Sequence, residues 1–507
     1  MPVDTLEIDA GVAASIGVEA ADAQQDGVVA EWLVDNDAAY TAFIAAIRRA
    51  RRSVCITQLA FDADCEAHTN DGPSIRLLDE LVNAWRTHAL DVRVLLNATL
   101  LVDTARPLRV ALAGMQATAI EVRGISRFPQ LLHAKVMIID DREAFLIGSP
   151  FVNGYWDDSA HQPDDARRPM RELGGRPLHD LSVRLEGSIV SALQAEFEAL
   201  WACGGDEVTP ASSVEQAPAR RAVNGPAQVS LTTAFRLNDK KDKGRAEILP
   251  AMVRGIGSAR ELLYIEHQYL SSRRVVRAIA DAIARHPQLE VIALVNQNPD
   301  VTAYRGWQNQ RLQESGLGEH PRFGLFALWS SGVTDGKISL NQVFVHSKLI
   351  VADDRWATFG SANIDGVSLH SYGADFRSRL GERVFRHVRN IDLNVELRGQ
   401  DDAIEASITE LRTTLWREHI GEVPSRRPRH GWIGHWRERA AMNIAALNGA
   451  PSAGLSAPLI LPYSTAPTPA AQLEGLGVVR RTELVLRFHP SWLEVYCSPN
   501  WIRNMFA

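Results

Sequence analysis

The segment "LLHAKVMIID" (131–140) recurs as "FVHSKLIVAD" (344–353), with histidine, lysine and aspartate at one spacing in both copies. Residues two apart in a strand point to the same face, so each histidine is expected to project beside its lysine. The chain has only six lysines among its 54 basic residues, which indicates that a compact ammonium group is required at these two places. The two expected half-sites are His133 with Lys135 and His346 with Lys348.

The aspartate of each copy lies seven residues after its histidine, on the opposite face of a straight strand. Asp140 and Asp353 are therefore predicted to fix the turn after the strand through hydrogen bonds, rather than to touch a substrate.

The rest of the chain repeats in the same order, with offsets of roughly 200 residues. Each half alternates apolar strands with helical segments, which predicts sheets covered by helices. The matching segments are 46–58 with 255–267, 90–97 with 289–296, and "HDLSVRLEG" (179–187) with "IDLNVELRG" (391–399). The sequence thus predicts an α/β protein made of two pseudo-twofold-related α-β-α sandwich domains with a small C-terminal extension.

Composition shifts and runs of Gly, Pro, Ser and Ala suggest the domain boundaries. The predicted parts are an N-terminal extension (1–27), a first repeat (28–202), a linker (203–228), a second repeat (229–420) and a C-terminal extension (421–507). Because both half-sites lie in one chain, a monomer would already hold the complete site.

The chain of 507 residues carries a formal net charge of −7, which disfavours a surface built to neutralise nucleic-acid phosphates. Its four cysteines lack paired metal-ligand spacing and are interpreted as reduced structural thiols. Residues 1–27 lack a basic start and a continuous apolar core, so no classical secretory signal is expected. Cytoplasmic synthesis is the expectation, with peripheral membrane association or signal-independent secretion left open.

The duplicated H-x-K-x-x-x-x-D motif resembles that of the phospholipase D superfamily, in which Gly-Ser or Gly-Gly and an Asn follow the motif. The second copy continues as "GSAN" and supplies Ser361 and Asn363. The first copy continues as "GSPFVN", so Ser149 is in place and Asn153 is the candidate for the asparagine. Residues 28–420 carry the resemblance, including "YIEHQYL" at the start of the second half. The branch that the sequence resembles is that of bacterial phospholipases D and cardiolipin synthases.

The resemblance implies cleavage of a phosphodiester through a covalent phosphohistidine, with no metal or other cofactor. It makes His133 the nucleophile and His346 the general acid and then base, a pair of roles that imidazole can fill at neutral pH. The lysines, both serines and Asn363 would hold the nonbridging oxygens. Asp180 and Asp392 recur in matching "DLxV" strands; we predict that Asp180 orients His133 and Asp392 orients His346, the alternative being turn carboxylates.

Other candidates are less specific. Glu266, His267 and Gln268 could line the cleft or pack in a core. The segment "HQPDD" (161–165), with His179 and Asp180, offers a metal-like mixture at irregular spacing, for which a polar loop is the preferred interpretation. Tyr155 and Trp156 either wall the cleft or pack internally.

The surroundings must decide which phosphodiester is cleaved. A phospholipid is favoured over nucleic acid, with hydrolysis or transphosphatidylation as the reaction and a cardiolipin synthase-like transferase as the alternative. A peripheral membrane contact is predicted because the segment 426–447 mixes five arginines with tryptophans, although packing of a connecting helix would explain it too. A role as a bacterial effector and a binding module with a degenerate site also remain open; the intact motifs favour an enzyme.

Overall fold

Alternating apolar residues build a mixed β-sheet in each half of the chain. In β2 (Ser53–Gln58), Val54 and Ile56 pack into one hydrophobic core, whereas Cys55 packs into another on the opposite face. The strand β8 (Val136–Ile139) beside it alternates in the same way. Both faces of the sheet are therefore buried, as expected of a sheet covered by helices.

The computed structural model of the chain describes residues 27–68, 73–99, 102–126, 130–168, 175–205, 227–233, 245–334, 337–370, 389–400, 402–421, 423–449, 458–478 and 484–487. Most of the predicted N-terminal extension and linker, and much of the C-terminal extension, lie outside these residues. The described part of the linker ends in a strand that begins at Ala227.

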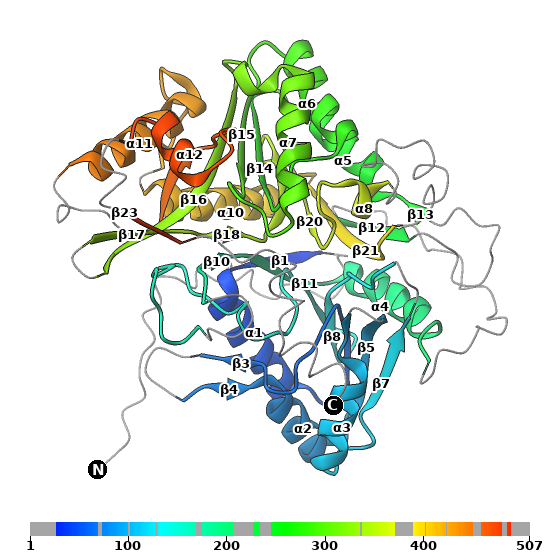
Figure 1. Cartoon of the computed structure of the whole chain (residues 1–507). Helices are drawn as coiled ribbons and strands as arrows, with labels where there is room; N and C mark the ends of the chain where they lie inside the picture. The colour runs from blue at the N-terminus through cyan, green and yellow to red at the C-terminus, as the bar shows by residue number, and fades with distance from the viewer. Residues whose placement is uncertain are drawn as a thin grey trace, which may run out of the picture.

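The two sheets, which lie one in each half of the molecule (Figure 1), share one strand order and one pattern of strand directions. The first is ordered β1 (Val29–Val34), β11 (Leu181–Glu186), β9 (Glu143–Leu146), β8, β2, β5 (Asp91–Thr99), β7 (Glu121–Ile125). The second is ordered β12 (Ala227–Thr233), β21 (Asp392–Arg398), β20 (Trp356–Gly360), β19 (Lys348–Ala352), β14 (Leu262–His267), β15 (Glu290–Val295), β16 (Phe323–Thr334). In each, only the last two neighbouring pairs are parallel. This match confirms the predicted pseudo-twofold α/β architecture.

Helices cover the sheets in three layers. The outer face of the first sheet carries α1 (Asp35–Arg49), α2 (Leu77–His88) and α3 (Ala105–Gly114). The outer face of the second carries α5 (Ile248–Ser258), α6 (Arg273–Arg285) and α7 (Thr302–Ser315). Between the sheets lie α4 (Ser188–Trp201) and α10 (Asp402–Ile420), which contribute to one core shared by both halves.

Short elements complete the structure. They are β3 (Glu66–Ala67), β4 (Ile75–Arg76), β6 (Val102–Asp103), β10 (Leu178–His179), β13 (Arg245–Ala246), β17 (Lys337–Gln342), β18 (Phe344–Val345), α8 (Gly366–Leu369) and the 3-10 turn η1 (Leu317–Glu319). Of these, β10 and β18 pair with each other in parallel and so join the two halves.

The described part of the C-terminal extension is built onto the second half. After α11 (Gly431–Asn448), strand β22 (Leu459–Pro462) pairs with β16, and α12 (Pro469–Gly475) follows. Strand β23 (Leu484–Arg487) pairs with β17 at the sheet edge. This part of the extension therefore enlarges the second sheet.

Candidate active site

The two histidine motifs meet where the halves meet. His133 precedes β8, and its backbone N–H donates to the carbonyl oxygen of Ile391 at 2.9 Å. His346 precedes β19, and its N–H donates to the carbonyl oxygen of His179 at 2.8 Å. Each histidine is therefore bound, through the backbone, to the residue before the repeated aspartate of the other half.

As a result of this backbone pairing, the side chain of each histidine contacts the repeated aspartate of the opposite half. Nδ1 of His133 lies 2.7 Å from Oδ1 of Asp392, and Nδ1 of His346 lies 2.8 Å from Oδ2 of Asp180. The prediction that Asp180 orients His133 and that Asp392 orients His346 is wrong. Within one half, β9 or β20 separates the aspartate strand from the histidine strand, whereas the bridge between the halves brings the opposite aspartate into contact.

The serines support these carboxylates. Ser361 Oγ donates to Oδ1 of Asp392 at 2.8 Å, and Ser149 Oγ donates to Oδ2 of Asp180. Asn36, at the start of α1, in turn donates to Ser149 Oγ at 2.8 Å. The two serines, predicted to bind phosphate or to have a structural role, thus hold the repeated aspartates in place.

The repeated lysines are fully buried beside their histidines. Nζ of Lys135 donates to the carbonyl oxygen of His133 at 2.9 Å, and Nζ of Lys348 donates to that of His346. Burial, and then Lys348, lowers the pKa of Lys135 to about 7, while burial lowers that of Lys348 to about 8. When both lysines are protonated, their two ammonium groups attract an anion strongly.

The histidines are neutral in the free protein. Burial and then Lys135 lower the pKa of His133 to about 4, although Asp392 opposes the shift. Burial and then Lys348 lower the pKa of His346 to about 3. Because a carboxylate only accepts, Nδ1 of each ring carries the hydrogen, and Nε2 is left with the lone pair.

The motif aspartates hold turns, in agreement with the prediction. The carboxylate of Asp140 accepts from the backbone N–H groups of Arg51, Arg52 and Ser53. That of Asp353 accepts from the N–H groups of residues 260–262 in the same way. Burial opposes ionisation of Asp140, but these donors lower its pKa overall. Both carboxylates thus tie the end of one strand to the start of its neighbour.

The two candidate asparagines have different surroundings. Asn153 accepts from the N–H of Glu66 and donates to the carbonyl oxygen of Asp64, so it braces a loop. Asn363 is buried, and its Oδ1 has no hydrogen-bond partner among the described residues. The position equivalent to Asn363 in the first half is Phe151, which packs against Phe61 in the core. At this position of the motif, therefore, the second half has an asparagine and the first half has a phenylalanine.

Two further polar residues lie beside the lysines. His267 pairs with Lys348 across β14 and β19, and the register of β2 and β8 continues to place Gln58 opposite Lys135. Both are fully buried, and within the described chain their side-chain nitrogen and oxygen atoms have no hydrogen-bond partner. Gln58 was missed from sequence, although the repeat offset of 209 residues aligns it with His267.

Most of the remaining candidates make contacts within the protein and away from the two motif histidines. Glu266 accepts from Ser347 Oγ at 3.0 Å, and Gln268 donates to the hydroxyl of Tyr269. Tyr155 lies edge-on to His346, with ring centroids 5.2 Å apart, and so walls the site. Trp156 is buried and packs internally.

The basic segment 426–447 buries several of its large apolar side chains, and Trp432 is half-buried. Ile433 and Trp436 of α11 are buried, and Trp436 contacts Tyr264, Phe326 and Trp416. For Ile433 and Trp436 the structure shows the alternative, the packing of a connecting helix, because their apolar surface is covered by the protein. In the described chain, no helix is long and apolar enough to cross a membrane.

The chain is similar to several known proteins. Residues 252–373 match the family described as "Cardiolipin synthase, PLD-like domain". "Phospholipase D A" of Dictyostelium discoideum is 23% identical over 471 residues, covering 79% of this chain and 36% of that protein. "Cardiolipin synthase B" of Shigella flexneri is 24% identical over 295 residues, covering 56% of this chain and 59% of that protein. The matched regions thus span less than two thirds of these relatives.

The fold has a counterpart among solved structures. Phosphatidylserine synthase from Haemophilus influenzae Rd KW20 superposes with a TM-score of 0.52 at 13% sequence identity, covering 76% of this chain and 86% of that one. The duplicated motif, the matched domain and these relatives together support the phospholipase D superfamily as the family of this chain.

Proposed function

We propose that the protein cleaves the phosphodiester of glycerophospholipids through a phosphohistidine and transfers the phosphatidyl group to water or an alcohol. The observation that carries this is the pair of imidazoles, each held through Nδ1 by an aspartate of the opposite half and each beside a buried lysine. Such a pair can divide one difficult displacement into two easier ones.

In the first step, Nε2 of His133 attacks phosphorus and forms the P–N bond. The bond from phosphorus to the headgroup oxygen breaks, and that oxygen takes a proton from the His346 imidazolium. The anionic diester favours this protonated form of His346, whose pKa is low in the free protein. Lys135 and Lys348 stabilise the charge that develops on the nonbridging oxygens.

In the second step, His346 is neutral and serves as a base. It takes the proton of a water or alcohol molecule, whose oxygen attacks the phosphorus of phospho-His133. The P–N bond breaks, and the phosphatidyl group leaves as phosphatidic acid or as a new diester. Neither step of this mechanism requires a metal ion at the phosphate.

Phospholipid is favoured as the substrate because the relatives are named as a phospholipase D and a cardiolipin synthase, and because the chain is acidic overall. Action on a bilayer requires a transient contact with its surface. Phosphatidyl transfer to the hydroxyl of phosphatidylglycerol, as in a cardiolipin synthase, is the second candidate, and it uses the same intermediate. Cleavage of nucleic acid is a third and weaker candidate.

The substrate test compares the wild type with His133→Ala and His346→Ala on vesicles of phosphatidylcholine, phosphatidylethanolamine or phosphatidylglycerol, with EDTA in the assay. We expect headgroup release by the wild type and a loss of at least about 10³-fold in both variants. Cardiolipin formed from phosphatidylglycerol would favour the transferase. Cleavage of plasmid DNA with intact vesicles would overturn the lipid assignment.

The roles of the two histidines can be separated with a p-nitrophenyl phosphodiester, whose leaving group needs no proton. His346→Ala should still release one equivalent of p-nitrophenol and accumulate phospho-His133, because it lacks the base for the second step. His133→Ala should release none. Phosphate trapped on His346 in the wild type would reverse the two roles, and a burst without any phosphohistidine would refute the covalent mechanism.

A further inference from the structure

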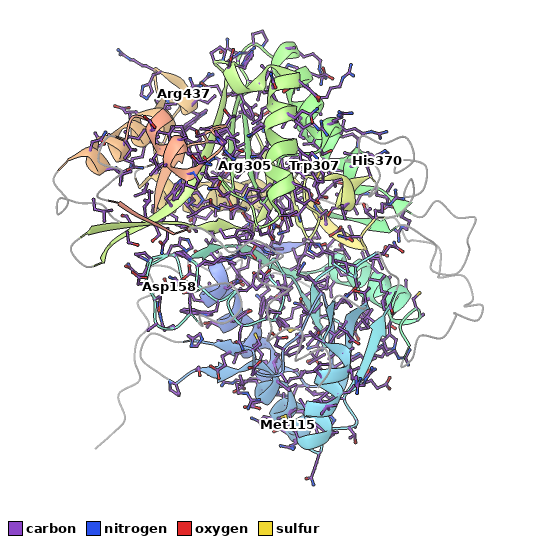
Figure 2. The ribbon with its side chains drawn as sticks, viewed as in Figure 1. Met115, Asp158, Arg305, Trp307, His370 and Arg437 are labelled. Carbon is purple, nitrogen blue, oxygen red and sulfur yellow. The ribbon has the colours of Figure 1, made fainter. Side chains whose placement is uncertain are left out.

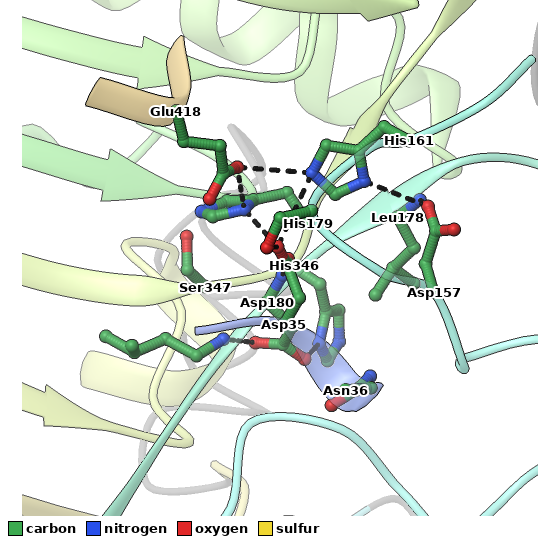
Figure 3. Close-up of polar contacts among 12 residues, drawn as sticks. Asp35, Asn36, Asp157, His161, Leu178, His179, Asp180, His346, Ser347 and Glu418 are labelled. Carbon is green, nitrogen blue, oxygen red and sulfur yellow. Dashed lines mark hydrogen bonds and ion pairs between the residues drawn. The ribbon is translucent and has the colours of Figure 1, made fainter. Parts of the chain in front are cut away.

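A second cluster of ionisable side chains lies buried between the halves, next to the candidate active site. It consists of Asp35 at the start of α1, His161 in the loop after β9, His179 in β10 and Glu418 near the end of α10. Figure 3 shows the four side chains pointing toward one another. Figure 2 shows that Asp158, in the same loop as His161, lies on the side of the first half that faces the second, whereas Met115 lies at the opposite end.

The N···O distances among the four side chains are close to the edge of a coordination tetrahedron, with Asp35 offering a different oxygen to each histidine. Nε2 of His161 lies 3.2 Å from Oε1 of Glu418 and 3.7 Å from Oδ2 of Asp35. Nδ1 of His179 lies 3.0 Å from Oδ1 of Asp35 and 3.0 Å from Oε1 of Glu418. Four ligands bound to zinc at their usual distances stand about 3.3 Å apart. One imidazole N–H aligns well with only one of the two oxygens near it, whereas a central cation would bind one atom of each of the four side chains.

The second nitrogen of each histidine is held by a further carboxylate. Nδ1 of His161 lies 2.9 Å from Oδ2 of Asp157, and Nε2 of His179 lies 3.1 Å from Oε2 of Glu266. Metal-binding histidines nearly always have such a partner, which fixes the ring and the tautomer. Asp157 is in turn bound by the buried guanidinium of Arg168 at 2.6 Å.

Charge balance also calls for a cation. When ionised, the carboxylates Asp35, Asp157, Glu266 and Glu418 bring four negative charges, and Arg168 neutralises one. Without a metal ion, protons on the imidazoles or on a buried carboxylate such as Asp35 would have to balance the remaining negative charge. A divalent ion supplies two positive charges at the centre of the cluster without placing imidazolium ions side by side.

We propose that Asp35, His161, His179 and Glu418 bind one divalent transition-metal ion, for which the four nitrogen and oxygen ligands favour zinc. Three ligands come from the first half and Glu418 comes from the second, so the ion would fasten the halves together. One of its ligands, His179, directly precedes Asp180 in the sequence, and the ion would not touch the phosphate. The inference goes beyond the proposed function, and its test does not depend on which diester is cleaved.

Metal content of the full chain gives the direct test. The protein is purified without a histidine tag or added chelator, and its metals are measured by mass spectrometry. We expect about one zinc per chain in the wild type and a loss of most of it in His161→Ala and Glu418→Gln. His430→Ala is the matched control, since His430, His435 and Glu438 form a separate exposed group of ligand atoms and the variant should retain the zinc.

Two measurements guard against variants that misfold. Apo wild type, prepared by prolonged dialysis against a chelator, should bind Co²⁺ with the intense visible absorption of a tetrahedral site, and zinc should raise its melting temperature. Asp157→Asn, which keeps all four ligands, should weaken zinc binding by about 10–100-fold. Apo protein that takes up neither ion, with an unchanged melting temperature, would overturn the inference. Loss of zinc in His430→Ala but not in Glu418→Gln would overturn it as well.

Discussion

At the scale of single residues, the site combines buried charge with missing hydrogen bonds. Lys135 and Lys348 are fully buried, and Gln58 and His267 beside them have no side-chain partner among the described residues. Buried groups of this kind cost stability unless something pairs with them. A bound phosphodiester would supply oxygen acceptors to all of them.

The lowered pKa of Lys135 predicts how activity depends on pH. Lys135 faces Lys348, Asp392, Asp180 and His133, and its pKa is about 7. It is charged below that pH and loses its charge above it, whereas His133, with a pKa of about 4, stays neutral down to mildly acidic pH. With a p-nitrophenyl diester, whose leaving group needs no proton from His346, we therefore expect kcat/KM, which reports the free enzyme, to hold between pH 5 and pH 7 and to decline above about pH 7–8.

A profile on soluble p-nitrophenyl diester avoids changes in the lipid surface with pH. A kcat/KM that falls tenfold from pH 6 to pH 5 would show that the nucleophile has an ordinary imidazole pKa. A profile flat to pH 10 would contradict the lowered lysine pKa.

Replacing Gln58 or His267 should separate function from stability. Gln58→Leu and His267→Leu remove unpaired polar atoms, so we expect melting temperatures that are unchanged or higher and a kcat/KM lowered by about tenfold for the lost contact with substrate. Asn153→Ala is the contrasting variant: it breaks two hydrogen bonds of a loop and should lower the melting temperature with kcat/KM retained. Equal kcat/KM for wild type and both leucine variants would place these residues outside the site.

At the scale of elements, α11 shows how burial can override a surface-like pattern. Its arginines and tryptophans have the composition of an interfacial helix, yet Trp436 is fully buried beneath α10 and β16. The exposed large apolar residue of this helix is Met442, which is 56% exposed.

Trp436→Ala should consequently destabilise the fold. Removal of a buried tryptophan costs about 3–5 kcal/mol, measurable as a lower free energy of unfolding in urea. Met442→Ala, on the same helix, should change that free energy by less than about 0.5 kcal/mol. If Trp436→Ala instead reduced vesicle binding at unchanged stability, α11 would be a membrane anchor after all.

At the scale of the whole molecule, the candidate active site is complete only when the two halves are packed together. Each histidine takes its aspartate from the opposite half, and the backbone pairs of His133 with Ile391 and of His346 with His179 hold that exchange in place. The proposed metal site lies on the same junction.

The crossed pairing can be tested with the phosphohistidine burst. Asp392→Asn should slow the burst by roughly 10²–10⁴-fold, because His133 loses the partner that fixes its tautomer. Asp180→Asn should leave the burst with an activated ester nearly intact and slow only the turnover that follows. A burst lost in Asp180→Asn but kept in Asp392→Asn, with phosphate on His133, would contradict the crossed pairs.

The sequence by itself determined the repeat, the alternation of strands and helices, the His-Lys pairs and the turns at Asp140 and Asp353. These depend on local periodicity and on residues close in sequence. It could not determine which aspartate serves which histidine, since strand order separates Asp180 from His133 within a half. Nor could it join His161 to Glu418, 257 residues away, into one cluster. Only tertiary structure decides such contacts, because they follow from how two packed sheets meet and not from spacing along the chain.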